Sequence, residues 1–413
     1  MKTIFSTLIF TMIFGLSACQ KDDINGQIDT IQVNEKSEQL ITANNDFGLD
    51  IFREVRNESE EQNIMISPLS ISVALAMAYN GAGGDTKKEM ENALRVAGLT
   101  ADEINVSYKI LINALQSLDE NVVFEIANAI YYADFFQLKT NFLEINKNNY
   151  NAEISALNFS SPAAIETING WVAEKTHNKI LSIINNLSDD DRMVLLNAIY
   201  FNGIWSKKFN DNGTKLRNFR KIDGSNIEVP MMSKEDTLEY AFNDLFQAIR
   251  LPYGNKQYNM VVVLPSEGKS SKDVIDELNA ENWNNWMKSF ANEDHVVVQM
   301  PRFKFAFNLE LKEALKKMGM EQAFSPALSD FSGISGDPDL YISSVIHKSY
   351  IDVNETGTEA AAVTAITFTT TSVGPEPVKK IYFIVDKPFV FAITEKDTGA
   401  ILFIGEVRNP VYD

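Results

Sequence analysis

The side chains best suited to acid–base or metal chemistry are three histidines, and they lie far apart in the sequence. His177, His295 and His347 each lack a second histidine or cysteine at helical spacing. The chain contains no Gly-x-Ser-x-Gly elbow, no His-Glu-x-x-His motif and no Cys-x-x-Cys pair, and its single cysteine is Cys19. We therefore expect no catalytic residue, no metal and no cofactor, and we predict that the protein is not an enzyme.

A glycine-rich stretch at residues 81–87 superficially resembles a phosphate-binding loop. That loop requires a lysine followed by serine or threonine after its last glycine, and here Thr86 precedes Lys87. The stretch therefore predicts a tight turn between two helices.

The first nineteen residues are typical of an export signal. Lys2 provides a positive charge, an apolar run follows, and Leu16-Ser17-Ala18-Cys19 closes the segment. The apolar run is shorter than the roughly 20 residues that span a membrane. Leu-Ser-Ala-Cys resembles the bacterial lipobox, whose cysteine becomes the lipidated first residue. The alternative is a plain signal peptide in which Cys19 is incidental.

The residues after Cys19 predict where the protein resides. Residues 20–23 resemble the surface-export tag of Bacteroidetes-type lipoproteins, and residues 20–43 are rich in polar side chains. We expect residues 1–18 to be a lipoprotein signal peptide, 19–43 a lipidated cysteine with a flexible tether, and 44–413 one domain. The protein is then an extracellular, surface-exposed outer-membrane lipoprotein, and its lipid is its only contact with the membrane.

The formal net charge of −19 argues against several classes of partner. No stretch gathers the five or more basic residues that a nucleic-acid or heparin patch requires. We expect neither nucleic acid nor heparin to bind, and we interpret the acidic balance as a source of solubility.

Helical patterns dominate the first half of the chain, and strand patterns dominate the second half. Phe47, Ile51 and Val55 are spaced by four, a helix opens at Ser67-Pro68, and Thr86 to Glu89 has the form of a capping box. Three C-terminal apolar runs separated by short turns predict a hairpin of buried strands. This order predicts an α+β architecture. Strands are predicted at residues 122–130, 194–201, 260–264, 296–300, 303–307, 381–385, 389–393 and 401–404.

The segment at residues 354–372 has an unusual composition and follows a predicted strand. After Glu359 it has no large charged side chain: small residues come first, and residues that prefer extended backbone follow. The segment could enter a sheet with one face inward, although its composition alone also fits an exposed loop or an edge strand. With a period of two, that face carries Thr358, Ala360, Ala362, Thr364, Ile366 and Phe368.

These residues resemble the hinge and reactive loop of the serpin family, and the resemblance covers about residues 44–411. The hinge pattern matches at Glu355, Gly357, Thr358, Glu359, Ala360, Ala361 and Ala362. Independent matches occur, in the family's order, within residues 63–70, 81–90, 197–209, 301–324, 387–389 and 403–410.

The resemblance implies an α+β serpin fold, with about nine helices packed on three β-sheets and an exposed reactive centre loop. It also implies a monomeric inhibitor that traps a serine or cysteine protease as a covalent complex, because the cleaved loop inserts into the central sheet. Gly357 would be the pivot of the hinge. His347 would hydrogen-bond with Asn197 and Ser67, unless it is an incidental strand histidine. By the same resemblance, Ser67, Asn197 and His347 would form the polar cluster that the family calls the shutter. Trp205 would lie beneath the point where the loop enters the sheet, which is called the breach.

Counting as the family does places the reactive bond between Thr371 and Ser372. The stretch that follows leaves this register open by one to three residues, and Phe368 is an alternative site. No lysine or arginine occurs from residue 358 to 378, which favours elastase-like or subtilisin-like proteases over trypsin-like ones. Two other classes stay open: a non-inhibitory serpin acting as a binding protein, and a hydrolase with a dispersed site.

Overall fold

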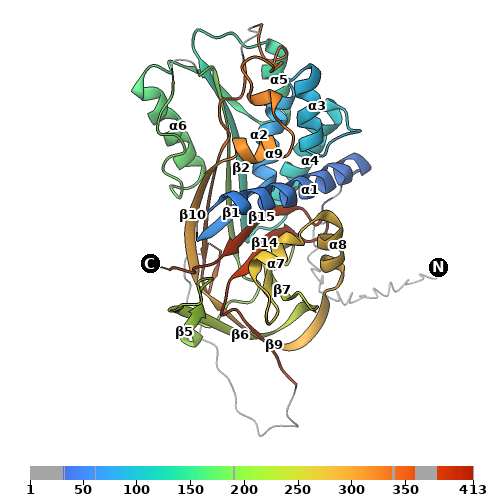
Figure 1. The fold of residues 1–413 in the computed structure, drawn as a ribbon, viewed down its shortest axis with the longest axis vertical. Helices are drawn as coiled ribbons and strands as arrows, with labels where there is room; N and C mark the ends of the chain where they lie inside the picture. The colour runs from blue at the N-terminus through green and yellow to red at the C-terminus, as the bar shows by residue number, and fades with distance from the viewer. Residues whose placement is uncertain are drawn as a thin grey trace, which may run out of the picture.

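The computed structural model describes residue 31 and residues 33–60, 62–188, 191–336, 340–358 and 379–412. In this part of the chain, nine α-helices pack around two hydrogen-bonded sheets (Figure 1), which confirms the α+β class. The helices are α1 (Glu35–Glu58), α2 (Pro68–Tyr79), α3 (Gly84–Ala93), α4 (Ala101–Ser117), α5 (Thr140–Tyr150), α6 (Pro162–Lys175), α7 (Ser271–Asp276), α8 (Ala280–Lys288) and α9 (Lys312–Lys317), with short 3-10 helices at Asp211–Gly213 and Gln322–Phe324.

A six-stranded sheet runs along the long axis of the molecule (Figure 1). Helix α6 packs on one side of it, at β2 and β4, and α2 packs on the other side. The strands, in spatial order, are β10 (Phe303–Glu310), β11 (Ile346–Val353), β12 (Gly357–Thr358), β4 (Met193–Ile204), β2 (Val122–Ala133) and β3 (Glu153–Leu157).

The second sheet has nine strands, and three of them, β8, β14 and β15, are buried along their whole length. Continuous burial means that both faces of these strands are covered. The strands, in spatial order, are β1 (Asn63–Ile66), β15 (Ile401–Val407), β14 (Phe389–Glu395), β8 (Tyr258–Pro265), β7 (Phe246–Tyr253), β6 (Asn226–Phe242), β9 (Ala291–Pro301) and β13 (Ile381–Ile384), and β5 (Lys215–Arg220) pairs with β6.

The structure corrects the expectation of three sheets, because β6 joins two of them into one hydrogen-bonded network. The first part of this 17-residue strand pairs with β5 and β9, and its end pairs with β7 and β9. A register shift between Asp236 and Leu238 interrupts its pairing with β9.

The predicted C-terminal hairpin is confirmed for β14 and β15, which form an antiparallel pair. The first of the three apolar runs was assigned to it wrongly, since β13 lies parallel to β9. An apolar run predicts a strand but carries no information on which strand it pairs with.

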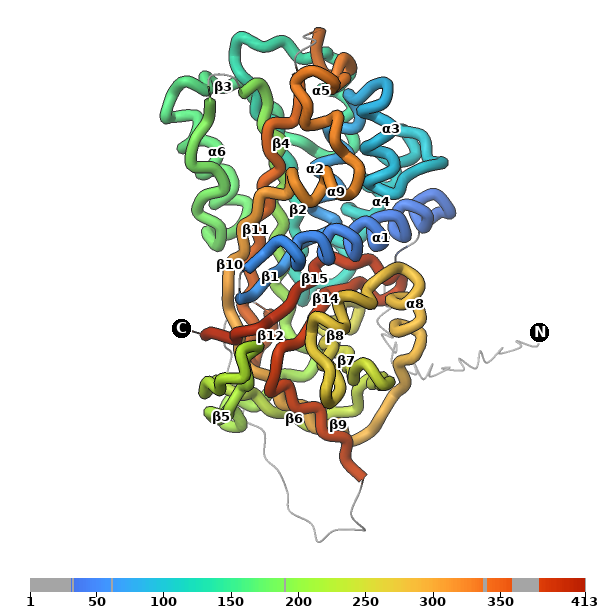
Figure 2. The backbone as a smooth tube through the Cα atoms, in the orientation of Figure 1, coloured from blue at the N-terminus to red at the C-terminus, as the bar shows by residue number. Residues whose placement is uncertain are grey.

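The predicted tether is wrong over its last nine residues, because α1 begins at Glu35 and not beyond residue 43. The side chain of Asn34 accepts a hydrogen bond from Ser37 N–H and caps the helix. Leu40 and Ile41 are buried in the core. Figure 2 shows α1 running across the molecule, between α2 and α4 on one side and β15 on the other.

The local expectations about α2 and α3 have different outcomes. Helix α2 is capped by Ser67 as predicted, and it is buried on nearly all sides. The capping box at Thr86 is wrong, because α3 already begins at Gly84 and the Thr86 hydroxyl accepts from Asp330 N–H at 2.9 Å. The tight turn between these helices is confirmed.

Among the residues that the structure describes, no helix is both long enough and apolar enough to cross a membrane.

Candidate hinge and insertion site

The hinge begins as a two-residue strand, β12, held between β11 and β4. Thr358 is paired with Val353 on one side and with Gly203 on the other. Gly357 lies so close to β4 that an added Cβ would stand 2.0 Å from the carbonyl oxygen of Gly203. Only glycine fits this approach. The predicted pivot residue is therefore already inside the sheet.

Glu355 anchors the turn before β12 through a buried carboxylate. The guanidinium of Arg302 reaches this carboxylate at 2.6 Å, and the hydroxyl of Thr214 donates to it. Its backbone oxygen accepts from Phe209 N–H at 3.0 Å. An ionised carboxylate that loses its water must be paired, and here a charged donor and a hydroxyl replace that water.

Trp205 supports the hinge from below with two hydrogen bonds. Its backbone N–H donates to Thr356 O and its indole N–H donates to Asn354 O, both at 2.9 Å. The indole stacks on Tyr253 at 4.3 Å, and the Tyr253 hydroxyl is 2.6 Å from Thr358 Oγ1. Burial raises the pKa of Tyr253, so its phenol stays neutral. These contacts fix the entry point of the sheet.

A slot extends below β12 between β4 and β11. Along the rest of their described lengths the two strands are not paired with each other, and β12 is the element that connects them. Where β12 lies between them, the two strands stand about two strand spacings apart, roughly 10 Å. At the far end of the slot, residues 193–196 of β4 and Ile346 of β11 line a cavity of about 370 Å³.

A polar network spans the slot halfway along its length. His347 Nε2 accepts from Ser67 N–H at 3.2 Å, and Ser67 Oγ accepts from Ser70 N–H at 3.2 Å. The Ser70 hydroxyl donates to Asn197 Oδ1, and Asn197 Nδ2 donates to Asn128 Oδ1 at 2.6 Å. The first turn of α2 therefore connects β11 to β4 and β2.

His347 is a neutral acceptor in this network. Burial lowers its pKa to about 4, and acceptance of the Ser67 N–H requires an unprotonated Nε2. Of the two expected partners, Ser67 contributes its backbone N–H. Asn197 is not a direct partner: the hydrogen bonds described for its side chain go to Ser70 and Asn128, because His347 stands on the opposite edge of the slot.

Several residues of the predicted site lie outside the described residues. They are Glu359, Ala360, Ala361, Ala362, Phe368, Thr371, Ser372 and Cys19.

The sequence did not single out five residues that complete the site. The resemblance covered Arg302, yet no pattern linked it to Glu355, some fifty positions away. The sequence gives one general indication of such a partner, because the Glu355 carboxylate would need a charged partner once the hinge enters a sheet. The five are Ser70, Asn128, Thr214, Tyr253 and Arg302.

The family model described as "Serpin (serine protease inhibitor)" matches residues 42–410. The chain belongs to the serpin family, whose members are mostly protease inhibitors, although some are not inhibitory. The fold agrees with this membership, since serpins are also found among the solved structures that match it.

Particular relatives come from distant organisms. An uncharacterized serpin-like protein of Thermococcus kodakarensis is 38% identical over 374 residues, covering 90% of this chain and 86% of the relative. The leukocyte elastase inhibitor of Bos taurus is 35% identical over 384 residues, covering 90% and 100%. The native-state structure of tengpin, a thermophilic serpin, matches with a TM-score of 0.82 at 31% identity, covering 92% and 95%. Human thyroxine-binding globulin, solved in complex with thyroxine, matches with a TM-score of 0.81 at 28% identity, covering 91% and 100%.

Proposed function

We propose that this serpin inhibits serine-type endopeptidases, with cysteine-type endopeptidases as a second target class, by trapping them as a suicide substrate. One observation carries the proposal: β12 occupies the head of the slot, and after Glu359 the sequence continues with residues 360–371, which are small or favour extended backbone. A loop that inserted after cleavage would therefore lengthen β12 along the slot.

The chemistry uses the protease's own nucleophile. Its hydroxyl or thiol attacks the carbonyl carbon of Thr371, the bond to Ser372 breaks, and the Ser372 amine leaves with the proton that the protease transfers. Insertion then carries the acyl group along the sheet. Fourteen residues from Thr358 to Thr371, at about 3.3 Å each, span roughly 46 Å. Distortion of the protease at the far end prevents water from cleaving the ester.

The register of β12 predicts where each inserted residue would lie. Six residues beyond Thr358, Thr364 would fall opposite Asn197 on β4 and His347 on β11. Its hydroxyl can donate to one and accept from the other, which would fill the gap between the two halves of the polar network. The residues that face the slot are therefore compatible with the loop that we propose enters it.

The same register bears on the target. Phe368 would fall opposite Met193, the first residue of β4, so cleavage after Phe368 would still fill the ladder along that strand. Cleavage after Thr371 would add three residues. We favour Thr371 and an elastase-like or subtilisin-like target, since small β-branched residues suit such enzymes; one relative is named as a leukocyte elastase inhibitor.

We further propose that the chain is a monomer, that it acts as a trap and not as a catalyst, and that it works outside the cell. Lipidation of Cys19 would anchor it to the outer membrane, and residues 20 to 30 would separate the folded part, which includes buried Ile31, from the bilayer. The support is the order of features in the sequence: an export signal, a lipobox-like Leu-Ser-Ala-Cys and a polar stretch that ends at the α1 cap.

The test is to incubate the protein with elastase-like and subtilisin-like proteases and to separate the products on SDS gels. We expect a covalent complex, and mass spectrometry of the released peptide should show an N-terminus at Ser372 or at Thr369. Cleavage with no complex for any protease would contradict inhibition. Turnover of an added substrate would contradict the prediction that the chain is not an enzyme.

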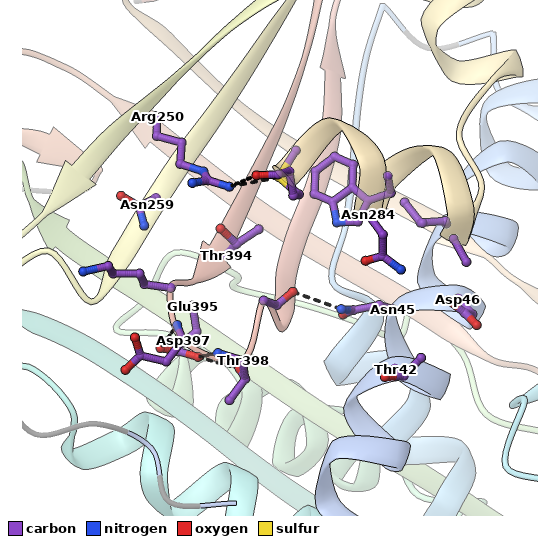
Figure 3. A pocket seen from close by; sticks show the side chains of 16 residues that line it. Thr42, Asn45, Asp46, Arg250, Asn259, Asn284, Thr394, Glu395, Asp397 and Thr398 are labelled. Carbon is purple, nitrogen blue, oxygen red and sulfur yellow. Dashed lines mark hydrogen bonds between the residues drawn. The ribbon is translucent and has the colours of Figure 1, made fainter. Parts of the chain in front are cut away.

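A second candidate function, that of a binding protein, is favoured by one cavity of about 260 Å³ between α1, α8 and the β14–β15 turn (Figure 3). Several of its polar groups, however, already bind within the chain. Asn45 bonds with Gly399 and Ile401, and Arg250 donates to Met287 O at 2.8 Å. Loop cleavage without complex, together with saturable binding of a small apolar dye, would support this second candidate.

A further inference from the structure

A buried lysine lies beneath the hinge and has no role in the mechanism above. Lys234, on β6, has a side chain that is only 4% exposed. Its ammonium donates to Lys207 O at 2.9 Å, lies 3.9 Å from the Asp236 carboxylate and stands 4.8 Å above the ring of Phe209. Burial of an ammonium group is costly, so such a residue calls for an explanation.

Residues 205–209, here called the bridge segment, connect this lysine to the hinge. On the β6 side, the Lys207 ammonium donates to Glu235 O at 2.8 Å and to Asp236 at 3.0 Å, and Lys234 donates back to the bridge segment. On the hinge side, Trp205 N–H donates to Thr356 O and Phe209 N–H donates to Glu355 O. The bridge segment is therefore tied to β6 along one edge and to the hinge along the other.

We infer that Lys234 is a positioning residue: it holds the bridge segment against the hinge and so sets the rate at which the loop inserts. The inference rests on the proposed function. Without the contacts of Lys234 with the bridge segment, the hinge would be held less firmly at the head of the slot. Insertion would then be slower relative to hydrolysis of the acyl-enzyme.

The tie depends on pH. Burial lowers the pKa of Lys234 to about 8; the neighbouring Lys207 acts in the same direction, and Asp236 opposes it. Across the bridge segment the charged groups are Glu355 and Arg302, which pair with each other. Above pH 8 the hydrogen bond to Lys207 O loses its charge assistance and weakens. The hinge is therefore held firmly below pH 8 and less firmly above it.

The experiment measures the ratio of covalent complex to cleaved inhibitor from pH 6.5 to 9.5, with one protease. The ratio for each variant is divided by the wild-type ratio at the same pH, so that the pH dependence of the protease itself cancels. We expect Lys234→Met to lower the ratio about three- to tenfold at pH 7 and to converge with the wild type above pH 8. Lys234→Arg, which stays charged, should exceed the wild type at high pH, and Lys109→Met, at an exposed position on α4, should leave the ratio unchanged. A Lys234→Met ratio equal to the wild type at pH 7 would overturn the inference.

A second measurement separates this inference from the proposed function. Tryptophan fluorescence of the intact protein, which includes Trp205, should titrate near pH 8 in the wild type and in neither Lys234 variant. Absence of this transition in the wild type would overturn the role of Lys234. Its presence, with no complex at any pH, would overturn inhibition alone. If Lys234→Met fails to fold, Lys234→Arg still decides the question.

Discussion

His347 and Asn197 line one cavity from opposite edges of the slot, and they are joined through Ser67 and Ser70 instead of by a direct hydrogen bond. At its head the slot is one strand wide, because β12 fills it there. The network connects the two strands without a direct hydrogen bond between His347 and Asn197, which is compatible with a residue entering between them.

Acid should weaken the folded protein through His347. Its pKa is about 4 when folded and about 6.5 when unfolded, so the unfolded chain binds more protons between these values. The contribution is fully present above pH 6.5 and is lost as the pH falls towards 4, by on the order of 3 kcal/mol. Urea midpoints at pH 7 and pH 4.5 should show a clear drop. His347→Gln keeps an acceptor without a titration and should reduce that drop, whereas exposed His177→Gln should not; equal drops in all three proteins would refute the assignment.

Replacing either partner of the ion pair between Arg302 and Glu355 should lower the free energy of unfolding, by an amount that depends on which partner is replaced. The Glu355 side chain is 5% exposed and that of Arg302 is 30% exposed. Arg302→Met strands a buried carboxylate, which costs about 3 to 5 kcal/mol, whereas Glu355→Gln leaves a partly hydrated cation and costs about 1.5 to 3 kcal/mol. Chemical unfolding gives both values. The control is Lys316→Met, which breaks an exposed pair and should cost under about 1 kcal/mol. The reverse order of the two costs would contradict this account.

Two neighbouring alanines should respond in opposite ways to a large charge. If the loop inserts in the β12 register, Ala362 would lie on the same face of the sheet as buried Thr358, and Ala361 would lie on the opposite face. Ala362→Arg should therefore abolish the covalent complex and leave the loop cleavable. Ala361→Arg is the matched control and should keep most of the complex on SDS gels. Equal yields from both variants would show that the register is wrong.

The Thr364 hydroxyl should contribute to thermal stability only after the loop has been cleaved and inserted. Thr364→Val conserves shape but removes the hydroxyl that would bond with Asn197 and His347. We expect the thermal midpoint of the cleaved protein to fall by an amount that corresponds to about 1 to 3 kcal/mol, since one donor and one acceptor in the network lose a partner. The intact protein should keep its midpoint. Thr369→Val, beyond the described end of β4, serves as the control; an effect on the intact form alone would exclude the proposed contact.

Cys19 should determine membrane association. Cys19→Ser removes the thiol that lipidation requires, so the protein should move from the detergent phase to the aqueous phase in Triton X-114 partitioning. Inhibitory activity should not change, because Cys19 lies twelve positions before Ile31, the first buried residue that the structure describes. Partition of the wild type into the aqueous phase would support the plain signal peptide instead.

The sequence was informative wherever one side chain defines a local structure, and weak wherever two distant segments meet. Ser67-Pro68 predicted the start of α2 because a cap and a proline act within one turn. The contact of Glu355 with Arg302, and the joining of two sheets by β6, depend on long-range pairing that no local pattern encodes. The tether was assigned too long because Asn34 looks like any other polar residue until Leu40 and Ile41 are buried behind it.

The two residues of β12 change the kinetics of the reaction that we propose. Starting a new strand is the slow part of sheet growth, because several residues must be ordered before the first contacts compensate for the lost entropy. Here Thr358 is already registered with Gly203 and Val353. The first residues of the new strand would then be paired before cleavage. Insertion would only lengthen this strand, one residue after another, and would begin without a lag.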